Sequence, residues 1–207
     1  SVLQWARDHR RHHRYVDRDG DPYSITGGFW HAHFLWMFHK RALEPGERWP
    51  VDLWRDPLVR WQHRFYRPSV AVLGFALPAG LAWTWGDPWG GFLVAGVLRM
   101  VINHHLTFSI NSICHRFGSR PYSVRHTARD NAVTALFTYG EGYHNFHHEF
   151  ASDYRNGVRA HQFDPSKWLI FILALLGLAS GLRRTPAARI AACRAAMRAR
   201  RLAAAAC

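Results

Sequence analysis

The sequence predicts an all-α membrane protein, in which a hairpin of two transmembrane spans carries a cytoplasmic, histidine-rich cap of helices. Two apolar runs predict the hairpin: Ser69–Gly86 contains no charged residue, and Trp89–Cys114 contains only Arg99, apart from histidines. Each run approaches the roughly 20 apolar residues that cross a bilayer as a helix. Because proline cannot donate a backbone hydrogen bond, we expect the first span to kink near Pro78. The alternative is a pair of buried helices in a soluble bundle.

Positive charge predicts which side of the membrane the cap occupies. Residues 1–67 contain 12 of the 27 Lys and Arg residues, residues 112–207 contain 14, and only Arg99 lies between them. Both flanks of a two-span hairpin lie on one face, which the positive-inside rule makes cytoplasmic. Arg99 is expected to snorkel or to pair within the bundle. Two shorter apolar runs, Gly27–Phe38 and Trp168–Leu182, are expected at the membrane surface or packed on the cap.

The composition excludes several classes of protein. The 207 residues are 48% hydrophobic and 14% aromatic, which is too apolar for a disordered chain. The net charge of +13 predicts an anionic partner. Three cysteines without a CxxC spacing make a disulfide framework unexpected. We divide the chain into a main domain, residues 1–182, and a basic Ala/Arg-rich tail, residues 183–207, which its composition predicts to be helical.

Two groups among the 15 histidines share one spacing, i, i+3 and i+4, which places three side chains on one face of a helix. The two groups are His9, His12 and His13, and His144, His147 and His148. Six ring nitrogens exceed the three or four ligands of a single zinc site, so two metal ions are the natural interpretation. The spacing leaves the metal open, since imidazole binds iron, copper, zinc and nickel.

A seventh histidine, His115, follows the second span. Asn111 and His115 are one helical turn apart, at the expected membrane boundary. Spacing alone leaves His115 open between a metal ligand and a hydrogen-bonded core residue. The other histidines have no repeated spacing and are interpreted as structural or surface residues: His31, His33, His39, His63, His104, His105, His126 and His161.

Three longer motifs contain these histidines. They are WARDHRRHH at residues 5–13, NSICH at residues 111–115 with Arg120-Pro121-Tyr122 after it, and GEGYHNFHH at residues 140–148. DYR at residues 153–155 and FDPSKW at residues 163–168 follow. In these motifs and in their order, nearly the whole chain resembles the membrane fatty acid desaturases of the acyl-CoA delta-9 (stearoyl-CoA desaturase) type.

This resemblance implies oxygen-dependent introduction of a cis double bond, at the delta-9 position, into a long-chain acyl-CoA or a related acyl thioester or lipid. It implies two iron ions, with O2 as co-substrate. The implied iron ligands are His9, His12, His13, His115, His144, His147 and His148, with Asn111 reaching the metal through water. The implied contacts to the CoA head are Arg7, Asp8, Lys40, Arg41 and Phe108, the last in place of a Trp. Arginine and lysine suit a phosphate-rich group, although ordinary positive-inside charge explains them equally well.

The chemistry requires further partners. The chain carries neither a four-cysteine cluster nor a G-x-G-x-x-G fingerprint, so electrons must come from outside. The resemblance implies a ferredoxin or a cytochrome b5-type donor, and membrane lipid as surroundings. Metal-binding histidines normally donate their second ring N–H to a carboxylate or another acceptor. The nearest candidates in sequence are Asp8, Glu141, Glu149 and Asp153.

One family feature is missing. The family has an earlier box, H-x-x-x-x-H, and no two histidines here stand five positions apart. Together with the start at Ser1, this predicts a chain that lacks its first two spans, and we expect no signal peptide. The alternative functions are a related membrane alkyl hydroxylase, an inactive desaturase fragment, and a non-catalytic basic membrane protein. Nucleic-acid binding is not expected, because the Arg-rich tail lacks aromatic stacking partners.

Overall fold

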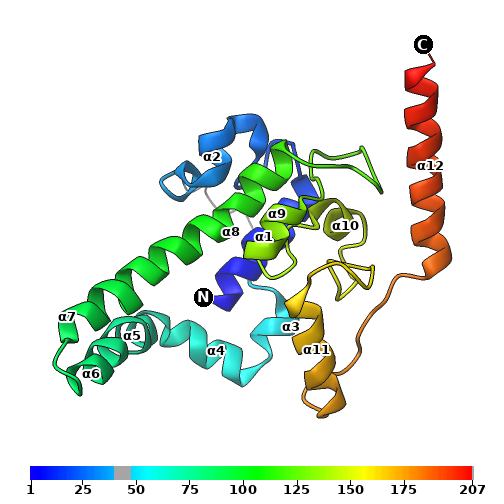
Figure 1. Cartoon of the computed structure of the whole chain (residues 1–207). Helices are drawn as coiled ribbons and strands as arrows, with labels where there is room; N and C mark the ends of the chain where they lie inside the picture. Colours follow the sequence, from blue (N-terminus) through cyan, green and yellow to red (C-terminus); the bar gives the residue numbers. More distant parts are fainter. Residues whose placement is uncertain (40–47, 207) are drawn as a thin grey trace. The chain divides into compact units, whose positions relative to one another are not determined.

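The computed structural model describes residues 1–39 and 48–206 (Figure 1). The described residues are helical, and their only β structure is two isolated bridges, which confirms the all-α fold class. The α-helices are α1 Val2–Tyr15, α2 Phe29–His33, α3 Val51–Trp54, α4 Pro57–Arg64, α5 Tyr66–Ala71, α6 Leu77–Trp83, α7 Pro88–Gly90, α8 Arg99–Arg116, α9 Ala132–Phe137, α10 His144–Glu149, α11 Pro165–Leu175 and α12 Ala187–Ala205. Short 3₁₀ turns cover Ile25–Gly27 and Leu35–Met37, and π-helical segments cover Val72–Ala76 and Gly91–Leu98.

The chain divides into two compact units. Unit 1 comprises Ser1–Pro22 and Trp36–His105, and unit 2 comprises Tyr23–Leu35 and Leu106–Cys207. Unit 1 therefore contains α1, the helices from α3 to α7 and the start of α8. Unit 2 contains α2, the rest of α8 and the helices from α9 to α12. The predicted division of the chain at residue 182 stays a prediction.

Two helical stretches of the described chain are candidates for membrane spans. Residues Pro88–Arg116 form a continuous helix that is long and apolar enough to cross a bilayer, and only 22% of its most apolar window is buried. Such exposure disfavours the alternative of a buried helix in a soluble bundle. Tyr66–Trp83 passes the same test only together with α4, from which it bends by 73°. The second predicted span is thus one continuous helix among the described residues, whereas the first is part of a bent pair.

Pro78 disturbs the first run of helix as expected. It has no N–H to donate to the carbonyl of Gly74, four residues earlier, and the π-helical segment immediately precedes α6. Arg99 compensates in part, because its Nη2 donates a long hydrogen bond of 3.4 Å to Gly74 O. Its Nε donates to Ala95 O at 2.7 Å. Arg99 therefore pairs with backbone carbonyls within unit 1, the second of its two predicted roles.

A glycine lets the two apolar segments of unit 1 approach closely. A Cβ at Gly91 would lie 2.5 Å from both the Cβ of Ala82 and the carbonyl oxygen of Pro78. Any larger residue would force these segments apart. Small residues at such crossings are the usual device of helices that pack in lipid, where close van der Waals contact replaces the hydrophobic driving force.

The core of unit 2 lies around α10, where the buried aromatic rings are those of Tyr122, Phe146 and Phe150. Ile190 and Cys193 of α12 pack against this cluster. The basic tail is thus helical, as predicted, and one face of it is docked on the core. In Figure 1, α12 is the red helix that ends the chain.

Helix α11 is an apolar helix of 11 residues, too short to cross a bilayer. It starts where the Asp164 side chain accepts a hydrogen bond from Lys167 N, and it ends at Leu175, earlier than the apolar run to Leu182 suggests. The side chains of Leu169, Ile172 and Leu175 are more than half exposed. This agrees with the interfacial helix that the sequence predicts.

Candidate metal centre

The first histidine group lies on α1, in unit 1. Helix α1 begins at an N-cap serine, whose side chain accepts the backbone N–H of Gln4. The Nε2 atoms of His9 and His13 are 3.2 Å apart, and the ring centroids of His12 and His13 are 5.8 Å apart. The helical spacing therefore gathers these three rings on one face, as predicted.

His12 has a carboxylate partner that spacing did not identify. Its ring is 1% exposed, and its Nδ1 lies 2.8 Å from Asp21 Oδ1. A carboxylate at Nδ1 keeps the proton on that nitrogen, so Nε2 presents its lone pair as a ligand. The candidate nearest in sequence, Asp8, instead forms an ion pair of 2.9 Å with Arg7.

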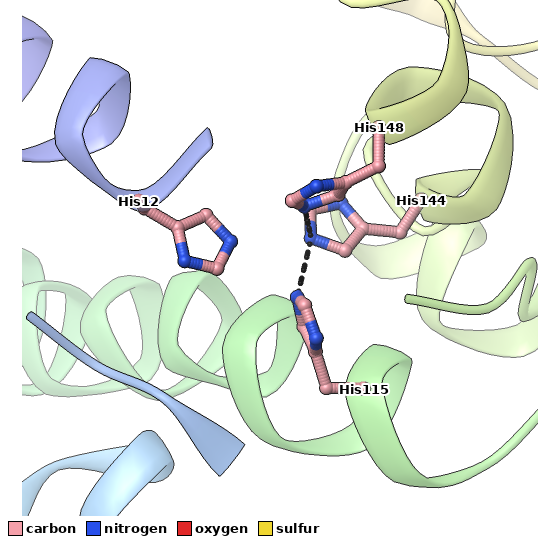
Figure 2. A group of neighbouring side chains, drawn as sticks. All are labelled: His12, His115, His144 and His148. Carbon is pink, nitrogen blue, oxygen red and sulfur yellow. Dashed lines mark hydrogen bonds between the residues drawn. The ribbon is translucent and has the colours of Figure 1, made fainter. Parts of the chain in front are cut away.

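Three further histidines converge within unit 2, from two helices. His115 comes from the end of α8, and His144 and His148 come from α10 (Figure 2). His144 Nε2 lies 3.1 Å from His115 Nε2 and 3.1 Å from His148 Nε2. His12, also drawn in Figure 2, belongs to unit 1. The structure therefore brings His115, which spacing left open, together with two members of the second group.

His147 lies beside the other two histidines of α10, at ring distances like those within the first group. Its ring centroid lies 5.6 Å from that of His144 and 5.8 Å from that of His148, and its ring is half-buried. It is not one of the three histidines whose Nε2 atoms converge in unit 2. Asn111, also half-buried, lies one turn before His115 on α8.

The donor set of unit 2 fits a metal ion. Two imidazole nitrogens bound to one ion at about 2.1 Å lie about 3.0 to 3.4 Å apart, for angles between a right angle and the tetrahedral one. His115 Nδ1 lies 2.7 Å from Thr127 Oγ1, so the ring can donate its N–H to this hydroxyl. His115 Nε2 then presents its lone pair to the other two rings. Both His115 and His144 are buried, so solvent has little access to the nitrogens.

Asn145 fixes the helix that carries the second group. Its side chain is completely buried and makes four hydrogen bonds to the backbone of a neighbouring loop. Oδ1 accepts from Tyr122 N at 2.9 Å and Ser123 N at 3.2 Å, and Nδ2 donates to Ser123 O and Ala128 O, both at 2.9 Å. Helix α10 has only six residues, so this anchoring decides where His144 and His148 lie.

Asp130 supports the start of the same helix. Its Oδ1 accepts the N–H groups of Asn145 at 2.9 Å and Phe146 at 3.1 Å, which α10 itself cannot satisfy. Burial raises the pKa of Asp130 to about 7, against the opposing effect of these two hydrogen bonds. Glu141, another of the candidates nearest in sequence, is exposed to solvent.

The remaining carboxylates near the second group have other partners. Glu149 pairs with Arg125 at 2.7 Å, and Asp153 pairs with Arg155 at 2.8 Å. The residues that hydrogen-bond the rings are Asp21 and Thr127. Asp21 follows His12 by nine residues, and Thr127 follows His115 by twelve. The three acids in residues 17–21 are a signal that could have identified Asp21, whereas no sequence pattern indicates Thr127.

The residues expected at the CoA head are described only in part. Lys40 and Arg41 lie outside the described residues. The guanidinium of Arg7 lies over the ring of Trp49, at 4.8 Å, in unit 1. Phe108 is buried on α8 in unit 2, and its ring centroid lies 6.0 Å from that of His33. His33 Nδ1 lies 2.8 Å from Ser112 Oγ.

Fold and site together define a class: all-helical proteins with a histidine-rich candidate metal centre and a helix of membrane-spanning length. Residues 1–170 match the model of the family described as "Fatty acid desaturase". Because the match covers well over half of the chain, the protein belongs to the fatty acid desaturase family.

Individual relatives agree with this family. The chain is 45% identical over 190 residues to a "Probable acyl-CoA desaturase" of Schizosaccharomyces pombe, which covers 90% of the chain and 39% of that protein. It is 37% identical to "Stearoyl-CoA desaturase 5" of Homo sapiens, covering 88% of the chain and 57% of the relative. It is also 37% identical to "Delta(9)-fatty-acid desaturase fat-7" of Caenorhabditis elegans, covering 86% and 54%. The chain thus spans between about two fifths and three fifths of the length of these relatives.

Proposed function

We propose that the gene product carrying this chain is an acyl desaturase, which uses O2 to introduce a cis double bond at the delta-9 position of a long-chain acyl-CoA. The observation that carries the proposal is the convergence of His115, His144 and His148 in a chain of the desaturase family. The names of the relatives support the substrate class, and the C. elegans relative supports the position of the double bond.

The proposed cofactor is a pair of iron ions. The ligands would be His9, His12, His13, His115, His144, His147 and His148, with Asn111 reaching the metal through water. Nitrogen pairs 3.1 to 3.2 Å apart within each unit support this set. Iron with O2 supplies the oxidising power to remove two hydrogens from an unactivated methylene pair, which no protein side chain can do. The protein's own groups hold the rings in the required tautomer and exclude water.

The proposed substrate contacts are Arg7, Asp8 and Phe108, together with Lys40 and Arg41. The planar guanidinium of Arg7 suits a phosphate of the CoA head, and its ion pair with Asp8 would fix its direction. Phe108, buried in the middle of α8, would contact the same head. Electrons would come from a ferredoxin or a cytochrome b5-type protein.

We propose a membrane location in which α5 to α8 form the two-span hairpin and the histidine groups face the cytoplasm. One continuous apolar helix and a bent helix pair support the hairpin. The concentration of Lys and Arg on both flanks supports the orientation.

Product analysis tests the proposed function. The complete gene product, in membranes supplied with an electron donor, is expected to convert stearoyl-CoA to its cis delta-9 alkene, and only in the presence of O2 and iron. Gas chromatography with mass spectrometry identifies the product. An alcohol would identify the related alkyl hydroxylase instead. A protein that binds iron but gives neither product would contradict the enzymatic assignment.

Asp21 provides a second prediction, as a residue that positions His12. Replacing Asp21 with alanine is expected to lower kcat and iron affinity by about 10- to 100-fold, the usual effect of losing the partner of a metal-binding histidine. KM for the acyl substrate should change little. Iron titration of the purified variant separates this role from a structural one. The control is Asp19→Ala, an exposed acid in the same loop, which should leave both quantities unchanged. Equal losses in both variants would contradict the role of Asp21.

A further inference from the structure

A basic cleft lies between α12 and the loop that follows α8, within unit 2. Its larger lobe has a volume of about 330 Å³ and contains Arg120 and Arg129 from the loop and Arg200 and Arg201 from α12. A smaller lobe of about 190 Å³ contains Arg159, Arg194 and Arg198 and shares Arg201 with the first. Met197 lines both lobes. Neither lobe has a carboxylate among its lining residues in the described part of the chain.

The larger lobe holds positive charge that no ion pair within the described residues neutralises. The ion pairs between described residues involve other arginines: Arg7, Arg10, Arg125 and Arg155. Within the cleft, Arg201 donates to the backbone carbonyl of Arg120, and Arg129 donates to that of Gly118.

The side chain of Arg129 shows the effect of this excess positive charge. Its Nε is buried and makes no hydrogen bond in the described structure. Burial lowers the pKa of Arg129, and repulsion from Arg120 and Arg116 lowers it further. Like charges that line a concave surface create a strong local field for anions.

The packing of α12 on the core of unit 2 fixes the position of the cleft's arginines. Ile190 and Cys193 on one face of the helix pack on the core of unit 2, and Met197 is buried one turn further along. This packing sets the arginines of α12 against those of the loop. The helix begins at Ala187, beyond residue 170, where the match to the desaturase family ends.

The geometry points to an anionic phospholipid headgroup as the ligand of this cleft, with its phosphate held by Arg120, Arg200 and Arg201. Guanidinium groups bind phosphate oxygens in pairs of parallel, charge-assisted hydrogen bonds. The lobes have the size of a small phosphate-bearing group, whereas an acidic protein would require a broad surface. The exposed apolar side chains of α11 in the same unit suit a lipid surface.

The test measures which phospholipid stays bound to the purified gene product in neutral detergent. Native mass spectrometry compares phosphatidylglycerol with phosphatidylcholine of the same acyl chains. The cleft variant is Arg120→Gln/Arg200→Gln/Arg201→Gln, and the charge-matched control is Arg55→Gln/Arg60→Gln/Arg67→Gln, three exposed arginines of unit 1. A single charge reversal, Arg200→Glu, provides a variant that leaves the Arg201 contact to Arg120 intact.

We expect the wild-type protein and the control to prefer phosphatidylglycerol, and the cleft variant to bind it at least about tenfold more weakly, the effect of losing one charged hydrogen bond. Arg200→Glu should weaken it similarly. Equal losses in the control would show attraction to positive charge in general and would overturn the proposal. Displacement of the lipid by inorganic phosphate or polyglutamate at equal concentration would overturn the lipid as ligand, in favour of a free phosphate or an acidic protein.

Discussion

Alanine in place of His144 is expected to eliminate the unsaturated product while the protein remains folded. The Nε2 atom of His144 lies 3.1 Å from those of His115 and His148. Removing His144 therefore takes away the member of this trio, His115, His144 and His148, that contacts both others. The backbone of α10 is held by the side chains of Asn145 and Asp130 rather than by the imidazole. Loss of one ligand should therefore remove metal without removing the helix.

The measurement combines product, metal and fold for the same sample. Product should fall below detection, iron content should fall, and circular dichroism should show unchanged helix content. His161→Ala, an exposed histidine of the same unit, is the control and should behave as wild type. Undiminished product from the His144 variant would contradict the metal assignment. His147→Ala is expected to give the same loss, and this variant tests the one member of the group that lies outside the trio.

Alanine in place of Asn145 is expected to lower the free energy of unfolding more than any other single change near the site. The change leaves two buried N–H groups and two carbonyls without their partner. Each buried polar group left unsatisfied costs about 1 to 3 kcal/mol, with partial relief if water enters, so we expect a total loss of about 3 to 5 kcal/mol. Helix α10 and the loop at residues 122–128 would lose their connection, and Thr127 lies in this loop.

Thermal unfolding followed by circular dichroism checks this prediction. The comparison is Asn131→Ala, which removes the helix-capping hydrogen bond from Thr134 N and a long one of 3.4 Å to Phe117 O, and should cost about 1 kcal/mol. The melting temperature of the Asn145 variant should fall several times further than that of the Asn131 variant. Similar decreases in the two variants would show that the loop and α10 hold together without this side chain.

Much of the site could be predicted because its spacing is local. The interval i, i+3, i+4 depends only on helical backbone, so the sequence was enough to group His9, His12 and His13 on one face. The same reasoning identified the apolar runs, and the structure confirms a continuous helix for the second run. The α-helix of the Ala/Arg tail followed from propensity in the same way.

Other features depend on residues that only folding brings together. His115 and His144 are 29 positions apart, and no periodicity relates them. The hydrogen-bond partners of the His12 and His115 rings are a carboxylate and a hydroxyl, which two loops bring next to these rings. The carboxylates nearest in sequence pair with arginines instead, because an ion pair forms wherever the side chains meet in space.

The sequence by itself determined the helical class, the two histidine faces and the family, because these follow from local geometry and from motifs read in order. Only the tertiary structure decided that Asn145 anchors the second histidine helix, that Arg99 pairs with the carbonyl near Pro78, and that α12 closes a basic cleft. The physical reason is that buried hydrogen-bonding groups and unneutralised charges take their partners from whatever the fold places within about 3 Å.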